Sequence, residues 1–302
     1  MNLSDFIYLE QNLETSQLYG SDCSIANLYL LQEKYNTFLL IHQNTLFRYY
    51  FGSENRTGWA FPIPLKNAAQ DFLKNALEFI FEQTKTQKLE LRFCLCTQEQ
   101  KNQIDACLAK NFNLKVEWKT NRDDCDYIYL QKNLAELPGS KYQKKRNHIS
   151  RFNRTYTNWT FKSYPENPIE KDILEVSQKW FKEKHGEADY VLQLEMQSIK
   201  SALEHTKELN ISGGVLYINE IPAAMTLAAP VSSSTLDVIY EKSTSEYEKD
   251  GAYAVINNQF AKNNPDFLYF NREEDMGVEG LRKAKLSYKP EILLEKFYGK
   301  IL

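Results

Sequence analysis

The sequence predicts an α+β protein whose two domains share one order of helices and strands. At 302 residues, the chain suits two domains of about 150 residues each. Aromatic residues make up 13% of the chain, which favours strand-rich folded structure over disorder. The hydrophobic pattern of the second half recurs, less clearly, in the first half, and this indicates a structural duplication.

The second half shows the clearer pattern. Ile173, Val176 and Trp180 recur at helical spacing, and the stretch "ISGGVLYINEIPAAMTLAAP" predicts a β-hairpin with its turn at Asn219-Glu220. In order, we expect a strand at 159–164, helices at 169–185 and 193–209, strands at 211–218, 221–230 and 235–243, a helix from Gly251, the strand "FLYFN", the helix "VEGLRKAKLSY" and the strand "EILLEKFYG".

The first half follows a similar order. We expect helices near 5–17 and 22–34, strands at 37–42, 46–52 and 58–63, a helix at 66–84, a strand at 88–94, a helix at 98–110 and a strand at 113–119. Pro138-Gly139 punctuates the segment that crosses between the halves. The predicted domains are therefore residues 1–135 and 136–302, with the site in the second.

Cysteine usage and hydropathy exclude several classes of protein. The five cysteines are scattered and stand far from the four histidines in sequence, so we expect neither a disulfide framework nor a metal site. Cys94 and Cys96 sit two apart in "LELRFCLC" and are interpreted as buried small hydrophobic residues of a strand. No stretch approaches the ~20 apolar residues of a membrane span, and no secretory signal is evident. These features predict a soluble, reduced, cytoplasmic protein without a transmembrane segment.

A basic stretch follows the Pro-Gly break. Between Gly139 and Arg154 there are six Lys or Arg and no Asp or Glu, although the whole chain has a net charge of −3. A cluster such as Lys144, Lys145 and Arg146 attracts phosphate, whether it belongs to tRNA, a coenzyme or a lipid. The alternative is a solvated face that binds nothing.

Three segments carry a resemblance to a known family. The order of elements resembles the GNAT (acyl-CoA N-acyltransferase) fold. The segments "KYQKKRNHISRF" (141–152), "GAYAVINNQF" (251–260) and "NREEDMGVEGLRKAKLSYKP" (271–290) are similar to those of the C-terminal domain of phosphatidylglycerol lysyltransferases and its soluble relatives. That resemblance implies two tandem GNAT-like domains, each with a mixed, mostly antiparallel sheet flanked by helices. It also implies transfer of an acyl or aminoacyl group from a phosphate-bearing carrier to an acceptor.

The implied carrier is either a coenzyme A thioester or aminoacyl-tRNA, with no metal, and the implied acceptor is a small molecule or a headgroup. In a GNAT fold, the carrier's phosphates bind where a strand gives way to a helix, which here is at Gly251, Ala252 and Tyr253. The usual pattern has Arg or Gln three residues before this Gly and Gly or Ala two after it. This chain has Glu248 and Tyr253 at those positions. Gly251 as a simple turn residue is the alternative.

The last segment supplies candidate catalytic groups. Arg282 and Lys285 share a helix face that would meet the carrier's phosphates. Glu274 and Asp275 follow a strand, where a general base for an incoming amine would stand. Tyr288 would protonate the leaving group. Each residue alone is equally consistent with a solvated helix. A function of another class also stays open, namely a ligand-binding or regulatory module that keeps the transferase fold without the chemistry.

Overall fold

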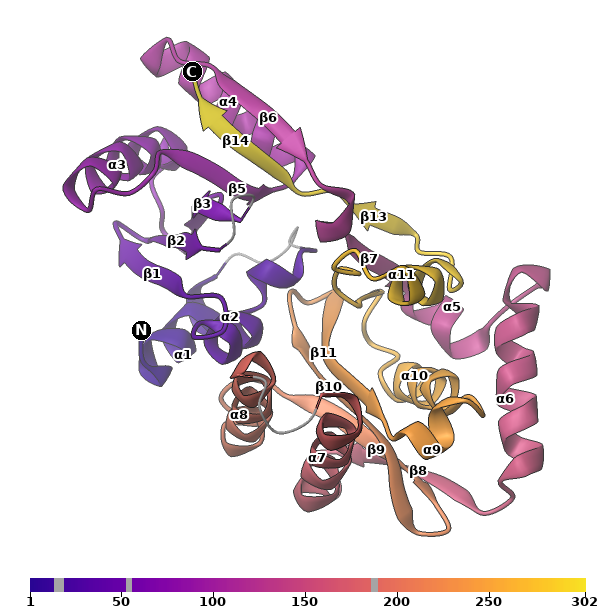
Figure 1. Cartoon of the computed structure of the whole chain (residues 1–302). Helices are drawn as coiled ribbons and strands as arrows, with labels where there is room; N and C mark the ends of the chain where they lie inside the picture. The colour runs from indigo at the N-terminus through magenta and orange to yellow at the C-terminus, as the bar shows by residue number, and fades with distance from the viewer. Residues whose placement is uncertain (14–18, 53–55, 186–189) are drawn as a thin grey trace. The chain divides into compact units, whose positions relative to one another are not determined.

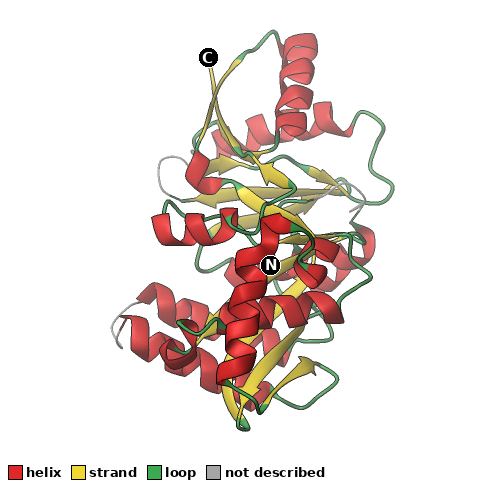
Figure 2. Cartoon of the chain, turned by 90° about the vertical axis from the view of Figure 1, so that its right-hand side faces the viewer, coloured by secondary structure: helices red, strands yellow, loops and turns green. Residues whose placement is uncertain are grey.

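The computed structural model describes residues 1–13, 19–52, 56–185 and 190–302 (Figure 1). The chain folds as two compact units. The first unit comprises Met1–Thr15, Gln32–Cys125 and Leu294–Leu302, and the second comprises Ser16–Leu31 and Asp126–Leu293. Both units combine helices with strands, as the colours of Figure 2 show.

The first unit is built around a mixed sheet in the order β1-β2-β3-β5-β14-β6, with β4 paired to β2. All of its pairs are antiparallel except β3 with β5. The strands are β1 (Thr37–His42), β2 (Thr45–Phe51), β3 (Thr57–Trp59), β4 (Ile63–Pro64), β5 (Arg92–Cys96), β6 (Val116–Thr120) and β14 (Phe297–Ile301). The helices are α1 (Leu3–Asn12), α3 (Phe72–Thr86) and α4 (Gln98–Phe112), with the 3-10 turn η2 (Arg122–Asp124).

The core of the first unit explains why these segments fold as they do. Trp59, Leu77, Phe93 and Ile104 come from two strands and two helices and bury together. Helix α4 begins at a capping box, in which the Thr97 hydroxyl accepts from the Gln100 backbone N–H while the Gln100 side chain accepts from the Thr97 N–H. Cys94 and Cys96 are fully buried, which confirms the prediction for this pair.

The second unit has a mixed sheet in the order β13-β7-β12-β11-β10-β9-β8. The pair β11–β12 is parallel, whereas β8–β9, β9–β10, β10–β11 and β7–β12 are antiparallel. The strands are β7 (Asp126–Leu130), β8 (Trp159–Tyr164), β9 (Ser212–Ile218), β10 (Ile221–Pro230), β11 (Thr235–Ser243), β12 (Tyr269–Asn271) and β13 (Ile292–Leu294). Its helical segments are η1 (Ser21–Cys23), α2 (Ile25–Leu31), α5 (Gln131–Glu136), η3 (Ser140–Tyr142), α6 (Gln143–Thr155), α7 (Glu170–His185), α8 (Tyr190–Glu204), α9 (Ser245–Glu248), α10 (Ala252–Asn263) and α11 (Glu279–Leu286).

The predicted order of elements is confirmed in both halves, and β8, β10 and β11 match their predicted bounds. The basic stretch, for which no secondary structure was predicted, is the helix α6, and Tyr142 and Phe152 are buried along one side of it. One prediction is corrected. The last predicted strand, "EILLEKFYG", is two strands, and β13 belongs to the sheet of the second unit whereas β14 pairs with β5 and β6.

The sheets do not follow a single boundary at residue 135. Strand β7 lies before that position but pairs with β12 in the second unit, and β14 lies at the C-terminus but belongs to the first unit. Residues 16–31 likewise group with the second unit. The division into domains 1–135 and 136–302 therefore stays a prediction, and the functional argument below uses the second unit alone.

Candidate functional site

A polar cluster lies in the second unit at the end of the parallel β11–β12 ladder. The ladder pairs Thr235, Leu236 and Asp237 with Tyr269, Phe270 and Asn271 and then stops. Beyond the last pair, Glu241 on β11 and Arg272 after β12 form an ion pair, with Nη2 of Arg272 2.7 Å from Oε1 of Glu241. A side-chain bridge thus replaces the backbone ladder where the strands are no longer paired.

Two aromatic rings lie beside the Arg272 guanidinium. Its Cζ lies 5.9 Å from the ring centroid of Tyr129 and 5.1 Å from that of Tyr288, within the range of cation–π attraction. Burial is the largest single effect and lowers the pKa of Arg272, but Glu241, Tyr129 and Tyr288 together outweigh burial, so the pKa is raised. The guanidinium is therefore a fixed positive charge in a site with little water.

Lys145 places a second cation against the ring of Tyr288. Its Nζ lies 3.7 Å from the ring centroid of Tyr288, and the side chain makes no hydrogen bond or ion pair with the residues that the structure describes. Burial, with the nearby charge of Arg272, lowers the pKa of Lys145 to about 8. A lysine with such a pKa has a substantial neutral fraction near pH 7.5 and is able to accept a proton.

Two tyrosines, Tyr288 and Tyr253, lie within range of the charge of Glu241. Burial raises the pKa of Tyr288 well above its usual range, and it raises the pKa of Tyr253 to about 12, with Glu241 adding to the latter effect. Both hydroxyls stay protonated at neutral pH and are available as hydrogen-bond donors. Of the predicted residues, Lys145 and Tyr288 lie beside Arg272 and its partner Glu241, whereas Tyr253 is linked to this cluster only through the charge of Glu241.

Replacing Lys145 by Met is expected to stabilise the protein at pH 7 by about 1 kcal/mol, because a half-buried ammonium is removed. In the wild type, the pKa of Lys145 is near 10.4 in the unfolded chain and about 8 in the native state. Wild-type stability therefore rises with pH between 8 and 10, and the advantage of the variant should shrink over that window. Urea unfolding at pH 7, 8, 9 and 10 measures this, with the exposed neighbour Lys144→Met as control. A constant difference between the variant and the wild type would contradict the burial of this charge.

Asp275 anchors the loop that follows β12. Its buried carboxylate accepts from Nε and Nη2 of Arg282 at 2.8 and 2.7 Å, from the backbone N–H of Gly277 at 2.9 Å and from the Tyr127 hydroxyl. These hydrogen bonds, above all those of Arg282, hold the pKa of Asp275 well below its usual range. A carboxylate so stabilised is a weak base, and the arrangement favours a positioning role for Asp275 and Arg282.

Lys285 has a similar role. Its side chain is buried, and its Nζ donates to three consecutive backbone carbonyls, those of Arg272 at 2.5 Å, Glu273 at 3.1 Å and Glu274 at 2.5 Å. Burial lowers the pKa of Lys285. Lys285 and Glu274, which were predicted in separate roles, are thus in contact through the backbone carbonyl of Glu274, and these hydrogen bonds fix the segment that carries Arg272.

The position at the start of α10 where phosphate is predicted to bind (the corner before α10) is in contact with groups of α6. Gly251 precedes the helix with φ +106°, and a Cβ atom there would stand 3.3 Å from the carbonyl oxygen of His148 on α6. Ala252 is fully buried. Nη2 of Arg151 donates to the carbonyl of Lys249 at 2.5 Å, so α6 packs directly against this corner, as its position beside α9 and α10 in Figure 1 also shows.

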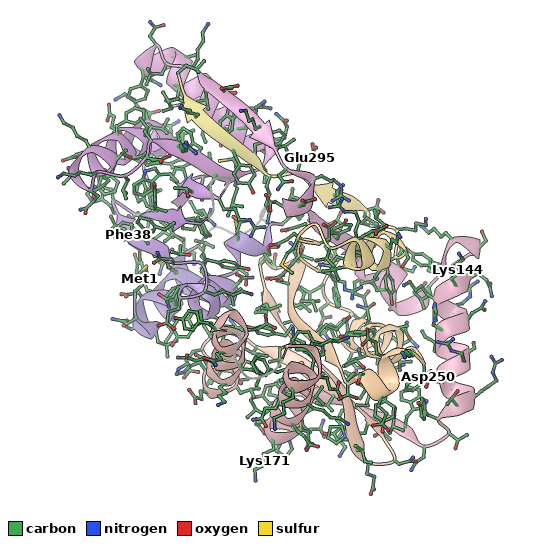
Figure 3. The ribbon with its side chains drawn as sticks, in the orientation of Figure 1. Met1, Phe38, Lys144, Lys171, Asp250 and Glu295 are labelled. Carbon is green, nitrogen blue, oxygen red and sulfur yellow. The ribbon has the colours of Figure 1, made fainter. Side chains whose placement is uncertain are left out.

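The remaining basic residues of the prediction divide into two kinds. Arg146 donates to the carbonyls of Leu137 and Gly139 and to the side chain of Gln143, so it stabilises the turn before α6. Lys144 is exposed on α6, where Figure 3 labels it. Lys144, His148 and Arg151 are all exposed and follow one another at i, i+4 and i+7, which places them on one side of the helix.

Sequence reasoning missed Arg272, Glu241 and Asn257. Arg272 stands inside the quoted segment "NREED", directly before the carboxylates that the prediction singled out. Glu241 lies in a correctly predicted strand, and its place in an otherwise mostly apolar run, "TLDVIYE", would have been the signal. A hollow of about 470 Å³ between α7 and α8, lined by residues such as Phe181, Lys182 and Met196, contains none of these groups.

The two mixed sheets flanked by helices give the chain a tandem GNAT-like fold. Residues 13–299 match the family described as "Phosphatidylglycerol lysyltransferase, C-terminal", and the chain belongs to that family. Family and fold together support an acyl or aminoacyl transferase kind of function. Of the helices that the structure describes, none has the length and apolar character needed to cross a membrane.

Solved structures agree with this assignment. A conserved protein of unknown function from Bacteroides thetaiotaomicron is 30% identical, with a TM-score of 0.87 over 99% of this chain and 97% of that one. L-PGS from Bacillus licheniformis (14% identical, TM-score 0.62, covering 99% and 90%) and FemX (11%, 0.63, 100% and 96%) share the fold. An uncharacterised protein of Mycoplasmoides gallisepticum is 23% identical over 201 residues, a match that spans 63% of each chain.

Proposed function

We propose that this protein transfers an aminoacyl group from aminoacyl-tRNA to a nucleophilic acceptor. The observation that carries the choice of carrier is the corner before α10, where the pyrophosphate of coenzyme A would bind in an acyl-CoA enzyme. Three carboxylates, those of Glu246, Glu248 and Asp250, stand within the six residues before Gly251. Glu246 and Glu248 pair with Lys179 and Lys184 on α7, and the segment presents acidic groups at the position where a coenzyme user needs groups that attract phosphate.

The packing of α6 adds a steric argument. The Tyr156 hydroxyl donates to Oδ2 of Asp250 at 2.8 Å, and Arg151 holds the carbonyl of Lys249. Figure 3 labels Asp250 just ahead of α10. Arg151 on α6 and Tyr156 at its C-terminal end therefore bind the loop on which a pyrophosphate would depend, and a coenzyme would have to displace them.

The exposed basic side of α6 is suited to the larger carrier. Lys144, His148 and Arg151 form a stripe on a helix without any Asp or Glu, and no acidic residue occurs from 137 to 165. Such a stripe follows a phosphate backbone without reading sequence. The stripe lies on the helix that also carries Lys145. An aminoacyl-tRNA bound along α6 would therefore have its aminoacylated end near the polar cluster.

The cluster supplies the proton transfers that the reaction requires. The acceptor's nucleophilic atom forms a bond to the ester carbonyl carbon, and the bond from that carbon to the ribose oxygen breaks. Neutral Lys145 takes the proton that the acceptor loses and, as an ammonium, returns it to the leaving oxygen. The ring of Tyr288 stabilises the ammonium in between, and its hydroxyl donates a hydrogen bond to the leaving oxygen.

Titrations of the full chain with coenzyme A and with aminoacyl-tRNA, each at 50 and 200 mM salt, test the carrier. We expect no measurable coenzyme A binding and micromolar tRNA binding that weakens at least tenfold between the two salt concentrations. Two single charge reversals test which surface binds tRNA. Lys144→Glu should weaken tRNA binding at least threefold, whereas Lys171→Glu, on an exposed position of α7, is the control and should not. Micromolar coenzyme A binding would overturn the proposed carrier.

A further inference from the structure

Arg272, Glu241 and Asn257 form one hydrogen-bonded chain of side chains in the second unit. Glu241 accepts from Nη2 of Arg272 through Oε1 at 2.7 Å and from Nδ2 of Asn257 through Oε2 at 3.4 Å. The three residues come from β11, α10 and the segment after β12. One carboxylate thereby fixes the orientation of a guanidinium on one side and of an amide on the other.

Each end of this chain carries a polar atom that no described residue satisfies. Nη1 of Arg272 and Oδ1 of Asn257 are both buried and have no hydrogen-bond partner among the described residues. The side chain of Arg272 is 13% exposed and Asn257 is 1% exposed. A buried polar atom without a partner costs about 1–3 kcal/mol, so two at the ends of one ordered chain indicate a ligand that pairs with both.

The unsatisfied atoms specify the ligand's chemistry. Nη1 is a charged donor and requires an acceptor oxygen, ideally one of a carboxylate, with which a guanidinium forms its strongest hydrogen bonds. Oδ1 is an acceptor and requires an N–H or O–H donor.

We propose that this chain of side chains binds the acceptor as an α-amino acid, with its carboxylate on Nη1 of Arg272 and its amino group on Oδ1 of Asn257. This inference rests on the proposed transferase function and names the acceptor class. The amino group then lies in the cluster that contains Lys145, which takes the proton released when the nitrogen attacks the ester carbonyl. The product is an amide joining the donated aminoacyl group to the acceptor amino acid.

Calorimetric titration of the full chain, without any tRNA, tests the inference. Each of the twenty standard amino acids is the probe, and the tightest is compared with its α-amide and its N-acetyl derivative. We expect one or more amino acids to bind, and both derivatives to bind at least tenfold more weakly, because each lacks one of the two recognised groups. Failure of all twenty to bind, or equal binding of either derivative, would overturn the proposal.

Two variants locate the binding. Asn257→Leu removes the acceptor atom at similar size and should weaken amino-acid binding at least tenfold, and Asn263→Leu, an exposed position on the same helix, should not. Thermal unfolding of both variants verifies folding, and if Asn257→Leu unfolds, Asn257→Ala takes its place and should weaken amino-acid binding at least tenfold. Wild-type affinity in Asn257→Leu would contradict the assignment. Release of amino acid from aminoacyl-tRNA, measured with hydroxylamine as a substitute acceptor, reports on the transferase function separately.

Discussion

Replacing Arg272 by Met is expected to lower the free energy of unfolding by about 3–5 kcal/mol and to abolish transfer. The ion pair between Arg272 and Glu241 is buried, with side chains only 13% and 12% exposed, so removing the cation leaves the Glu241 carboxylate without a charged partner in a site of little water. The rings of Tyr129 and Tyr288 also lose the cation that lies beside both of them. Urea unfolding at pH 7 measures the loss.

A double-mutant cycle distinguishes a coupled pair from two independent contacts. Glu241→Gln alone should also destabilise, whereas Arg272→Met combined with Glu241→Gln should cost clearly less than the sum of the single losses, because neither charge is then left unpaired. The exposed pair of Lys179 and Glu246 provides the matched control, and Glu246→Gln should change stability by less than about 1 kcal/mol. Additive losses at Arg272 and Glu241 would show that the pair does not organise the cluster.

The fold was largely predictable because its elements are encoded locally. The alternation of apolar residues gave the correct bounds for β8, β10 and β11, and helical spacing predicted α7 within one residue of its start. The last strand was predicted as one because "EILLEKFYG" is continuous in pattern. Its division into β13 and β14 depends on pairing with two different sheets, which is a long-range property that no local pattern contains.

The candidate site was harder to predict, and α6 shows why. Lys144 and Lys145 are equivalent in sequence, yet one is exposed and the other reaches Tyr288. The difference follows from helical phase, since Tyr142, Ile149 and Phe152 mark the buried side and Lys145 lies among them at i+3 from Tyr142. The stretch is so polar that its local pattern does not predict a helix, and the sequence alone therefore does not reveal this phase. Glu241 and Arg272 are 31 residues apart and meet only because β11 and β12 are parallel neighbours.

Replacing Asp275 by Asn is expected to destabilise the protein by about 2–4 kcal/mol, because a fully buried carboxylate loses its pair with Arg282 and an amide cannot accept from all of its donors. The pKa of Asp275 is lowered in the native state, so its contribution is present above the unfolded value of about 3.9 and is lost as pH falls below it. The stability gap between wild type and variant should therefore narrow below about pH 4.

Unfolding measured from pH 7 down to pH 3, together with kcat, decides between two roles for this carboxylate. Glu279→Gln, which breaks the exposed pair with Lys283 on α11, is the control and should alter stability by less than about 0.5 kcal/mol. If Asp275 positions the loop that carries Arg272, stability and kcat fall together in Asp275→Asn. If Asp275 is itself the general base, kcat falls while stability stays unchanged. That outcome would assign the role of general base to Asp275 instead of Lys145.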